Sequence, residues 1–236
     1  MDVQTAVDNY ERAMSHCDNI VRVHRAAGDG SVGRRIEEPS VNRGTIVLAV
    51  AAWQAFVQDV AVALRDTALA ELHLINGATV LPAAMQQWKV DFDSAVHKFA
   101  TPDPEKSRAL WKRVGFDPRP SWTWKQLGGR GSKAVVVQPV HVDKVINQWL
   151  KVRHAVAHGH AHIDALPVLQ AVRERKASAN APAAPNLRLT DAIDCMRFFR
   201  SIVRLTADAA AAHIQVSPPT WTKPPTFALG LHISNL

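Results

Sequence analysis

The sequence predicts an all-α protein: an antiparallel helical bundle with a basic loop insertion and an extended C-terminal arm. Apolar residues recur at spacings of three and four over several long stretches, which is the period of an amphipathic helix. Glycine and proline, which end helices, stand between those stretches. No internal repeat and no sharp change of composition divides the chain. We therefore expect one domain, 1–236, with its core at about 40–214 and its tail at 215–236.

Several of the expected helices have their own start or stop signal. The first ends at the glycines of AAGDG, and the second, after Ser40, is apolar over more than one face, which suits the centre of a bundle. The helix that begins near Val140 should stop at Gly159, and Thr190 is a suitable N-cap for the last. The expected helices cover 4–27, 41–64, 66–76, a proline-interrupted region at 80–114, 140–158 and 190–214.

The remaining segments are expected to lack helical structure. The stretch DPRPSWTWKQLGGRGSK has no helical periodicity and is expected to form a loop, and AVVVQPV could begin as a short β-strand. Residues 173–186 are expected to connect two helices as a loop. The tail contains four prolines in SPPTWTKPP and is expected to be extended, with one short strand at most.

The composition is that of an ordinary globular protein, with 47% apolar and 21% charged residues. The most apolar run contains Gln54, Gln58 and Asp59, so we expect no membrane span. The first residues include acids and lack the apolar segment of a signal peptide. Cys17 and Cys195 are too few for a disulfide framework. We therefore expect a cytoplasmic protein.

The net charge of +7 is concentrated in residues 105–133, where eight basic residues stand against only Glu105 and Asp117. A local basic patch suggests a polyanionic partner, nucleic acid first, whereas the alternative is a solvated surface that aids solubility. Two tryptophans in this region could stack on unpaired bases or could anchor the loop by packing. The candidate RNA-binding residues are Lys106, Lys112, Arg113, Arg119, Lys125, Trp122 and Trp124.

The stretch KVRHAVAHGH, residues 151–160, is the main candidate for a functional site. His154 and His158 are four residues apart and share a helix face, so one hypothesis is a metal site completed by His160 or His162. Against a metal site, Asp164 is the nearest carboxylate in sequence, and an alanine stands where a catalytic HExxH motif needs glutamate. Another interpretation is a solvated helix end, where positive charge suits the helix dipole.

The third hypothesis joins Arg153 to His158 in cleavage of an RNA phosphodiester. If the helix ends near Ala157, His158 leaves the regular spiral and can turn toward Arg153. The imidazole can then take the proton of a 2′-hydroxyl while the guanidinium stabilises charge on the phosphoryl oxygens. This chemistry needs no metal and no other cofactor. A twofold dimer would bring a second His158 to the same cleft.

Two stretches resemble the HEPN superfamily. RHAVAHG resembles its signature, an arginine followed after four to six residues by a histidine, with Arg153, His154 in the polar slot, His158 and Gly159 matching. VNRGTIVLAVAAWQAFVQDVAVAL, residues 41–64, resembles the first long helix of the RiboL-PSP-HEPN branch. The order of long helix, basic middle, motif helix and last long helix agrees, so the resemblance covers most of 40–214.

The resemblance implies an all-α homodimer whose motif helices meet across the twofold axis. It also implies a metal-independent endoribonuclease in a defence or toxin–antitoxin system, with an antitoxin or sensor protein encoded nearby as a partner. Arg153 and His158 would be catalytic and His154 supporting. Relatives often carry an acid where this chain has Gln54, although Asp59 lies just beyond. Toxins silenced by nucleotide transfer have a tyrosine where His160 stands, so that regulation is not expected here. The alternative is a non-catalytic HEPN-like module that binds RNA or scaffolds a partner.

Overall fold

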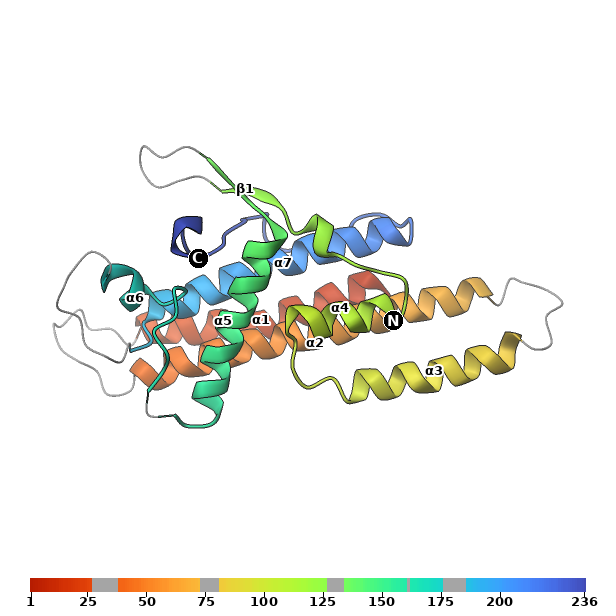
Figure 1. Cartoon of the computed structure of the whole chain (residues 1–236), viewed down its shortest axis with the longest axis horizontal. Coiled ribbons are helices and arrows are strands. Elements are labelled where there is room, and N and C mark those ends of the chain that lie inside the picture. The colour runs from red at the N-terminus through yellow and green to blue at the C-terminus, as the bar shows by residue number, and fades with distance from the viewer. Residues whose placement is uncertain (27–37, 73–80, 127–133, 161, 176–185) are drawn as a thin grey trace.

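The structure, a computed structural model, describes residues 1–26, 38–72, 81–126, 134–160, 162–175 and 186–236. These residues are mainly helical, which confirms the all-α class (Figure 1). The elements in chain order are α1 (Val3–Ala26), α2 (Glu38–Leu72), α3 (Leu81–His97), α4 (Pro104–Lys112), η1 (Arg119–Ser121), β1 (Trp124–Gln126), β2 (Val135–Val137), α5 (Pro139–Ala157), α6 (Gln170–Arg175), α7 (Leu189–His213) and η2 (Ile233–Asn235).

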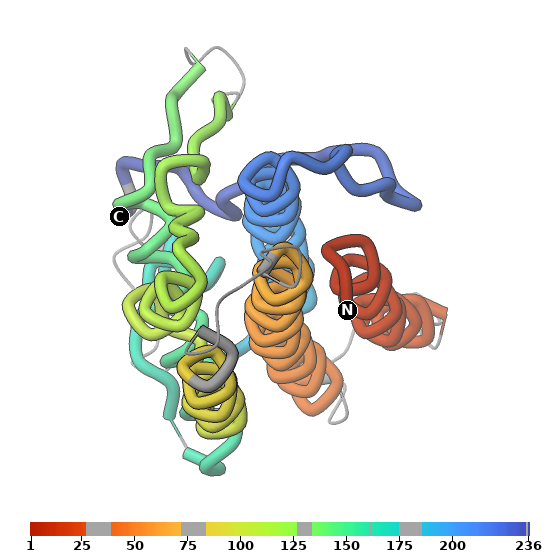
Figure 2. Tube along the Cα trace, turned by 90° about the vertical axis from the view of Figure 1, so that its right-hand side faces the viewer, coloured from red at the N-terminus to blue at the C-terminus, as the bar shows by residue number. Residues whose placement is uncertain are grey.

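Helix α2 lies at the centre, with α1 and α7 beside it (Figures 1 and 2). Tyr10 of α1 packs on Phe56 of α2 with ring centroids 5.6 Å apart, whereas Cys17 lies by Thr45, so these helices are antiparallel. Helix α7 runs in the same direction as α2. Asn42, near the start of α2, donates to the carbonyl of Leu187 just before α7, and Trp53, further along α2, stacks on Phe199, further along α7. The prediction of an antiparallel bundle is therefore wrong for α7. The chain between them returns to the starting end of α2, so α7 can only run parallel to it.

Helix α2 continues unbroken to Leu72, so the predicted division between 64 and 66 is wrong. The two polar residues at that point do not interrupt the helix because each has a partner outside it. Arg65 pairs with Asp93 of α3, and Asp66 accepts a hydrogen bond of 2.8 Å from the terminal amine. Because these side-chain pairs use no backbone group of α2, they leave its backbone hydrogen bonds intact.

Helix α2 is also long and apolar enough to span a membrane, judged by length and composition. Its segment Pro39–Glu71 reaches a mean hydropathy of 1.8 over the most apolar window, and 56% of that window is buried inside the molecule. The covering elements include α1, α5 and α7. The same composition is expected of the central helix of a bundle, which is buried on several sides.

The helices α3, α4 and α5 lie on the other side of α2 from α1 (Figure 2). Helix α5 crosses the long helices steeply rather than lying along them (Figure 1). It buries one face, including Val145, Trp149 and Val152, and leaves its last turn at the edge of the molecule. This crossing places the two ends of α5 on opposite sides of the protein.

The segment before α5 and the tail differ in part from their predictions. The strand expected in AVVVQPV is confirmed as β2, and it pairs antiparallel with β1, which lies in the predicted loop. Residues 127–133 of that loop, and 176–185 of the other predicted loop, lie outside the described residues. Helix α6 extends to Arg175, so the loop predicted from 173 begins later. The tail is extended, as expected, and its described residues end in the short helix η2.

Candidate functional site

The candidate site forms where α5 ends, at the position predicted from Gly159. Ala157 is the last helical residue, His158 is the C-cap and Gly159 has a φ of 65°. The backbone N–H of His160 donates to the carbonyl of Ala155 (2.9 Å), and that of Gly159 donates to Val156 (3.1 Å). These two bonds form a Schellman motif, which satisfies carbonyls at the end of the helix. The motif turns the chain so that three histidines gather at one exposed end.

Replacing Gly159 with alanine should lower the free energy of unfolding by about 1 kcal/mol, because a Cβ is strained at positive φ. The space around it is empty, so no clash contributes to this loss. Gly44 is the matched control, because its added Cβ also meets nothing but its backbone lies inside α2. Gly44→Ala should raise stability by about 0.5–1 kcal/mol. Urea unfolding of both variants checks the opposite signs, and a stabilised Gly159→Ala variant would contradict the account.

Three histidine rings lie together at this helix end. The ring centroids of His154 and His158 are 4.2 Å apart, and His160 lies 5.9 Å and 6.1 Å from them. His158 has φ −91° and ψ 5°, close enough to helical that its ring stays over His154. The ring of His158 therefore lies against that of His154, and the expected turn of His158 toward Arg153 stays a prediction. His160, which the sequence analysis considered only as a possible metal ligand, belongs to the cluster.

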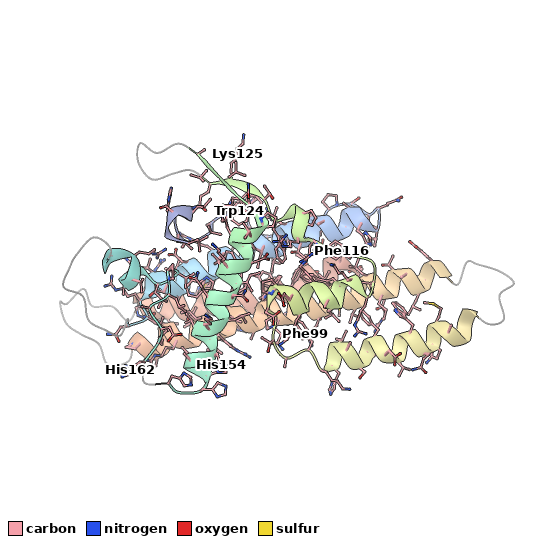
Figure 3. The ribbon with its side chains drawn as sticks, viewed as in Figure 1. Phe99, Phe116, Trp124, Lys125, His154 and His162 are labelled. Carbon is pink, nitrogen blue, oxygen red and sulfur yellow. The ribbon has the colours of Figure 1, made fainter. Side chains whose placement is uncertain are left out.

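Figure 3 shows His154 and His162 at the same edge of the molecule, at the end of α5. All four histidines of the motif region are exposed, so each can reach solvent or a ligand. Among the described residues, no group of three or more His, Cys, Asp or Glu side chains is arranged to hold a metal ion. The geometry of the cluster thus gives the metal-site hypothesis no support.

Arg153 lies one turn before the helix end, between the buried and exposed faces of α5. Its side chain is half-buried, and its Nε is shielded from solvent with no hydrogen-bond partner among the described residues. A guanidinium donor that is shielded but unpaired carries a desolvation cost that an incoming acceptor would remove. Phosphate oxygens are acceptors of the kind that the guanidinium fork prefers. Arg153 is therefore suited to contact an anion beside the histidines.

A groove of about 580 Å³ runs beside the histidine cluster. Its lining includes Lys151, His154, His160 and His162 from the end of α5, and Thr101 from the connection between α3 and α4. A smaller groove of about 270 Å³ shares Thr101 and is lined by Lys98, Lys106 and Arg113. We call these two grooves together the cationic track. Its four cations, Lys98, Lys106, Arg113 and Lys151, outnumber the two carboxylates, Asp103 and Asp164. Lys106 lies 3.5 Å from Asp103, which offsets its charge in part.

Sequence reasoning predicted Lys106 and Arg113 of this track but missed Lys98 and Lys151. Those two lysines lie outside the basic stretch 105–133, and only the fold, which places the connection between α3 and α4 beside the end of α5, brings them to one surface. A partial signal for Lys151 was available, since it begins the motif segment itself. Lys98 gives no sequence signal, because it is one exposed lysine after a helix.

The other predicted RNA-binding residues are not part of the track. Arg119 is held by Asp143 through bonds of 2.9 and 2.7 Å, and Lys112 lies 3.7 Å from Asp117, which also pairs with Arg108. Lys125 is exposed on the β-hairpin (Figure 3). The hairpin precedes the first turn of α5, whose 19 residues span about 28 Å. Lys125 is therefore remote from the histidines.

The two tryptophans of the basic region are buried, so their prediction as base-stacking residues is wrong for this conformation. Trp122 is 0% exposed, and its Nε1 donates to the hydroxyl of Thr206 in α7 at 2.9 Å. Trp124 is 7% exposed and packs near Phe227 of the tail. Each indole therefore anchors the segment before α5 by packing, which was the other interpretation of these two tryptophans.

The two α2 residues linked to the motif by resemblance have different surroundings. Gln54 donates through Nε2 to the carbonyl of Phe99 at 3.0 Å, and this bond fixes the connection that also carries Thr101 of the track. Asp59 accepts a bond of 3.0 Å from Asn9 of α1, so it belongs to the α1–α2 interface. Burial raises the pKa of Asp59, and the bond from Asn9 opposes this only in part.

Comparisons with known protein-family models, curated proteins and solved structures find no match for this chain. The resemblance of residues 41–64 and 153–159 to the HEPN superfamily therefore stays a prediction. Three features of the chain itself bear on its function: the histidine cluster, Arg153 and the cationic track.

Proposed function

We propose that the protein is a metal-independent endoribonuclease of HEPN type that acts in the cytoplasm. The observation that carries the proposal is the cationic track, whose lining includes His154 and His160 of the exposed cluster of three histidines. Arg153 and His158 are next to these residues in the sequence but are not among the lining residues of the track. Cations along a groove bind a phosphate backbone, and imidazoles titrate near neutrality and move protons. A single-stranded RNA lying in the track would present its phosphodiesters to the end of α5.

The cleavage step uses groups of the chain and the RNA only. His158 takes the proton of a 2′-hydroxyl, and that oxygen attacks the adjacent phosphorus. Arg153 stabilises the charge that gathers on the phosphoryl oxygens. The P–O5′ bond breaks, and the leaving oxygen takes a proton. The products are one RNA with a 2′,3′-cyclic phosphate and another with a 5′-hydroxyl.

The proton for the leaving oxygen is expected from a second copy of the chain. The rings of His154 and His158 are in contact, with centroids 4.2 Å apart, so no phosphoryl group fits between them. In-line displacement needs the base and the acid on opposite sides of the phosphorus. A twofold dimer, with the ends of α5 facing each other, would supply His158 of the partner subunit on the far side. His154 then orients His158 as a supporting residue.

The test of the proposal is incubation of the full chain with single-stranded RNA in EDTA. We expect fragments that carry 2′,3′-cyclic phosphate and 5′-hydroxyl ends, identified by mass spectrometry and by their resistance to ligation without end repair. A wild-type protein that leaves all RNA intact under conditions where it is folded and dimeric would contradict the proposal. Light scattering at micromolar concentration checks the dimer.

The track makes a separate prediction about which cations bind RNA. Lys98→Ala with Arg113→Ala should weaken binding and should reduce the slope of log K against log salt by roughly 0.7 for each phosphate that the variant no longer neutralises. Arg119→Ala with Lys125→Ala removes the same charge from residues outside the track. That control should leave affinity nearly unchanged in a filter-binding assay. Equal weakening in both double variants would mean that the track does not bind RNA.

The alternative, a non-catalytic module that binds RNA or scaffolds a partner, is supported by the same track. It predicts retention of RNA with no fragments in the cleavage assay. The exposed histidine cluster favours catalysis, because a binding surface has no need of imidazoles at the end of its groove. A defence or toxin–antitoxin setting, with an antitoxin or sensor as partner, follows from the HEPN resemblance.

A further inference from the structure

A second cavity, of about 510 Å³, lies on the other side of the protein between α1, α7 and the tail. Its volume falls within the usual range for small-molecule sites. The C-terminal segment leaves α7 and passes toward α1, where it covers the space between the two helices (Figure 2). Neither the candidate active site nor the cationic track shares a residue with this cavity.

The tail is fastened over this cavity by α1. Residues Gln4, Glu11 and Asp18 are seven apart and form one stripe of the helix. Gln4 bonds to Thr220 and Glu11 accepts from Thr222, with a hydroxyl-to-carboxylate distance of 2.8 Å. Asp18 pairs with Lys223 and, at 2.8 Å, with Arg200 of α7. The tail is therefore a built wall of the cavity.

The cavity carries an excess of positive charge. Arginines 197, 200 and 204 of α7 and Lys223 line it, against Glu11 and Asp18. Both carboxylates already have partners: Thr222 bonds Glu11, and Asp18 pairs with Arg200 and Lys223. Burial alone would raise the pKa of Asp18, but the bonds from those two cations lower it overall, so it stays ionised.

Two of the arginines keep donors for a ligand. Within the described residues the side chain of Arg197 makes no hydrogen bond or ion pair, and it is exposed at the cavity. Asp194, whose charge interacts with Arg197, is paired with Arg173 at 2.9 Å. Arg204 bonds to the carbonyl of Lys223 at 3.1 Å and stacks over Trp221. Among the described residues it forms no ion pair with a carboxylate, although its charge opposes the burial that raises the pKa of Asp208.

The cavity also has an unsatisfied polar group in its wall. Tyr10 lines it and is only 3% exposed, and its hydroxyl has no hydrogen-bond partner among the described residues. A buried hydroxyl without a partner is costly, and a ligand oxygen would remove that cost. Met14, Pro224 and Pro225 supply apolar wall beside it.

We propose that this cavity binds a small organic anion, a carboxylate or a phosphate ester. Its charged group lies against Arg197 and Arg204, its oxygen bonds to the Tyr10 hydroxyl, and its apolar part packs on Met14 and the tail prolines. This site is independent of the proposed RNA cleavage. Because the tail forms one wall, a bound anion also fixes the tail against α1 and α7.

The experiment is calorimetric titration of the full chain with phenyl phosphate, benzoate and the neutral benzyl alcohol, alongside thermal unfolding. One of the two anions should bind saturably with 1:1 stoichiometry and raise the Tm, and benzyl alcohol should not. The tighter anion identifies the class, phosphate ester or carboxylate. Absence of saturable binding by both anions at millimolar concentration overturns the proposal.

Two variants test the residues that would hold the anion, and one controls for charge. Arg197→Gln should weaken binding of that anion about 10- to 100-fold, and Tyr10→Phe about tenfold. Without the anion, Tyr10→Phe should be at least as stable as the wild type, because it removes an unsatisfied hydroxyl. Arg22→Gln makes the same charge change at an exposed site of α1 outside the cavity. Unchanged affinity in Arg197→Gln, or an equal loss in Arg22→Gln, overturns the proposal.

Discussion

His158→Ala is expected to slow RNA cleavage by about 100- to 10,000-fold, the usual contribution of a general acid or base. The residue is exposed at the C-cap of α5, so the substitution should leave the fold intact. His154→Ala should cause a smaller loss, because its ring supports that of His158. If the two act as one unit, the double variant should be hardly slower than His158→Ala. Single-turnover cleavage in EDTA measures each rate.

His16→Ala is the matched control, since His16 is also an exposed histidine but lies on α1, outside the cluster. It should cleave RNA at the wild-type rate. Arg153→Lys should also be impaired, because lysine keeps the charge but loses the planar fork. Full activity of His158→Ala would rule out the mechanism, and a loss confined to His160→Ala would move the proton transfer to His160.

The parts of the fold that could be predicted are those set by local pattern. The bounds of α1 and α7 lie within one residue of their expected positions, and α5 ends where Gly159 required. In each case the deciding signal is short in range: a hydrophobic period, or a glycine at positive φ. The prediction failed at Arg65, where it divided α2 into two helices. Arg65 and Asp66 pair with Asp93 and the terminal amine, which are distant in sequence.

The candidate site also has a part that local sequence predicts and a part that depends on tertiary packing. The motif histidines are close in sequence, so their proximity at the helix end could be predicted in part, although His160 joins them only through the Schellman turn. The RNA-binding residues depend on tertiary packing, and composition alone misplaced them. The basic stretch contains both Arg113, which lines the track, and Arg119, which Asp143 neutralises. Likewise, no local pattern distinguishes a tryptophan that stacks on bases from Trp122, which is buried against α7.

Trp53→Ala is expected to lower the free energy of unfolding by about 3–5 kcal/mol, the usual loss for a large aromatic residue removed from a core. Trp53 is 0% exposed and joins elements that are far apart in the chain. Its ring lies 5.9 Å from those of Trp111 in α4 and Phe199 in α7, and its Nε1 donates to the carbonyl of Pro102 at 3.0 Å. A loss of this size is a large fraction of a typical domain's stability.

Trp53→Phe separates packing from hydrogen bonding, because it keeps an aromatic ring but leaves the Pro102 carbonyl without its donor. We expect a loss of about 1–3 kcal/mol in the free energy of unfolding from the unpaired carbonyl.

The connection that carries Pro102 also carries Thr101 and Asp103 of the groove beside the histidines. Trp53→Phe should therefore weaken RNA binding at temperatures where the chain stays folded. Trp88→Ala, at a partly exposed tryptophan of α3, is the control for urea unfolding and filter binding. If Trp88→Ala lost as much stability as Trp53→Ala and as much RNA affinity as Trp53→Phe, Trp53 would not be the residue that couples the core to the track.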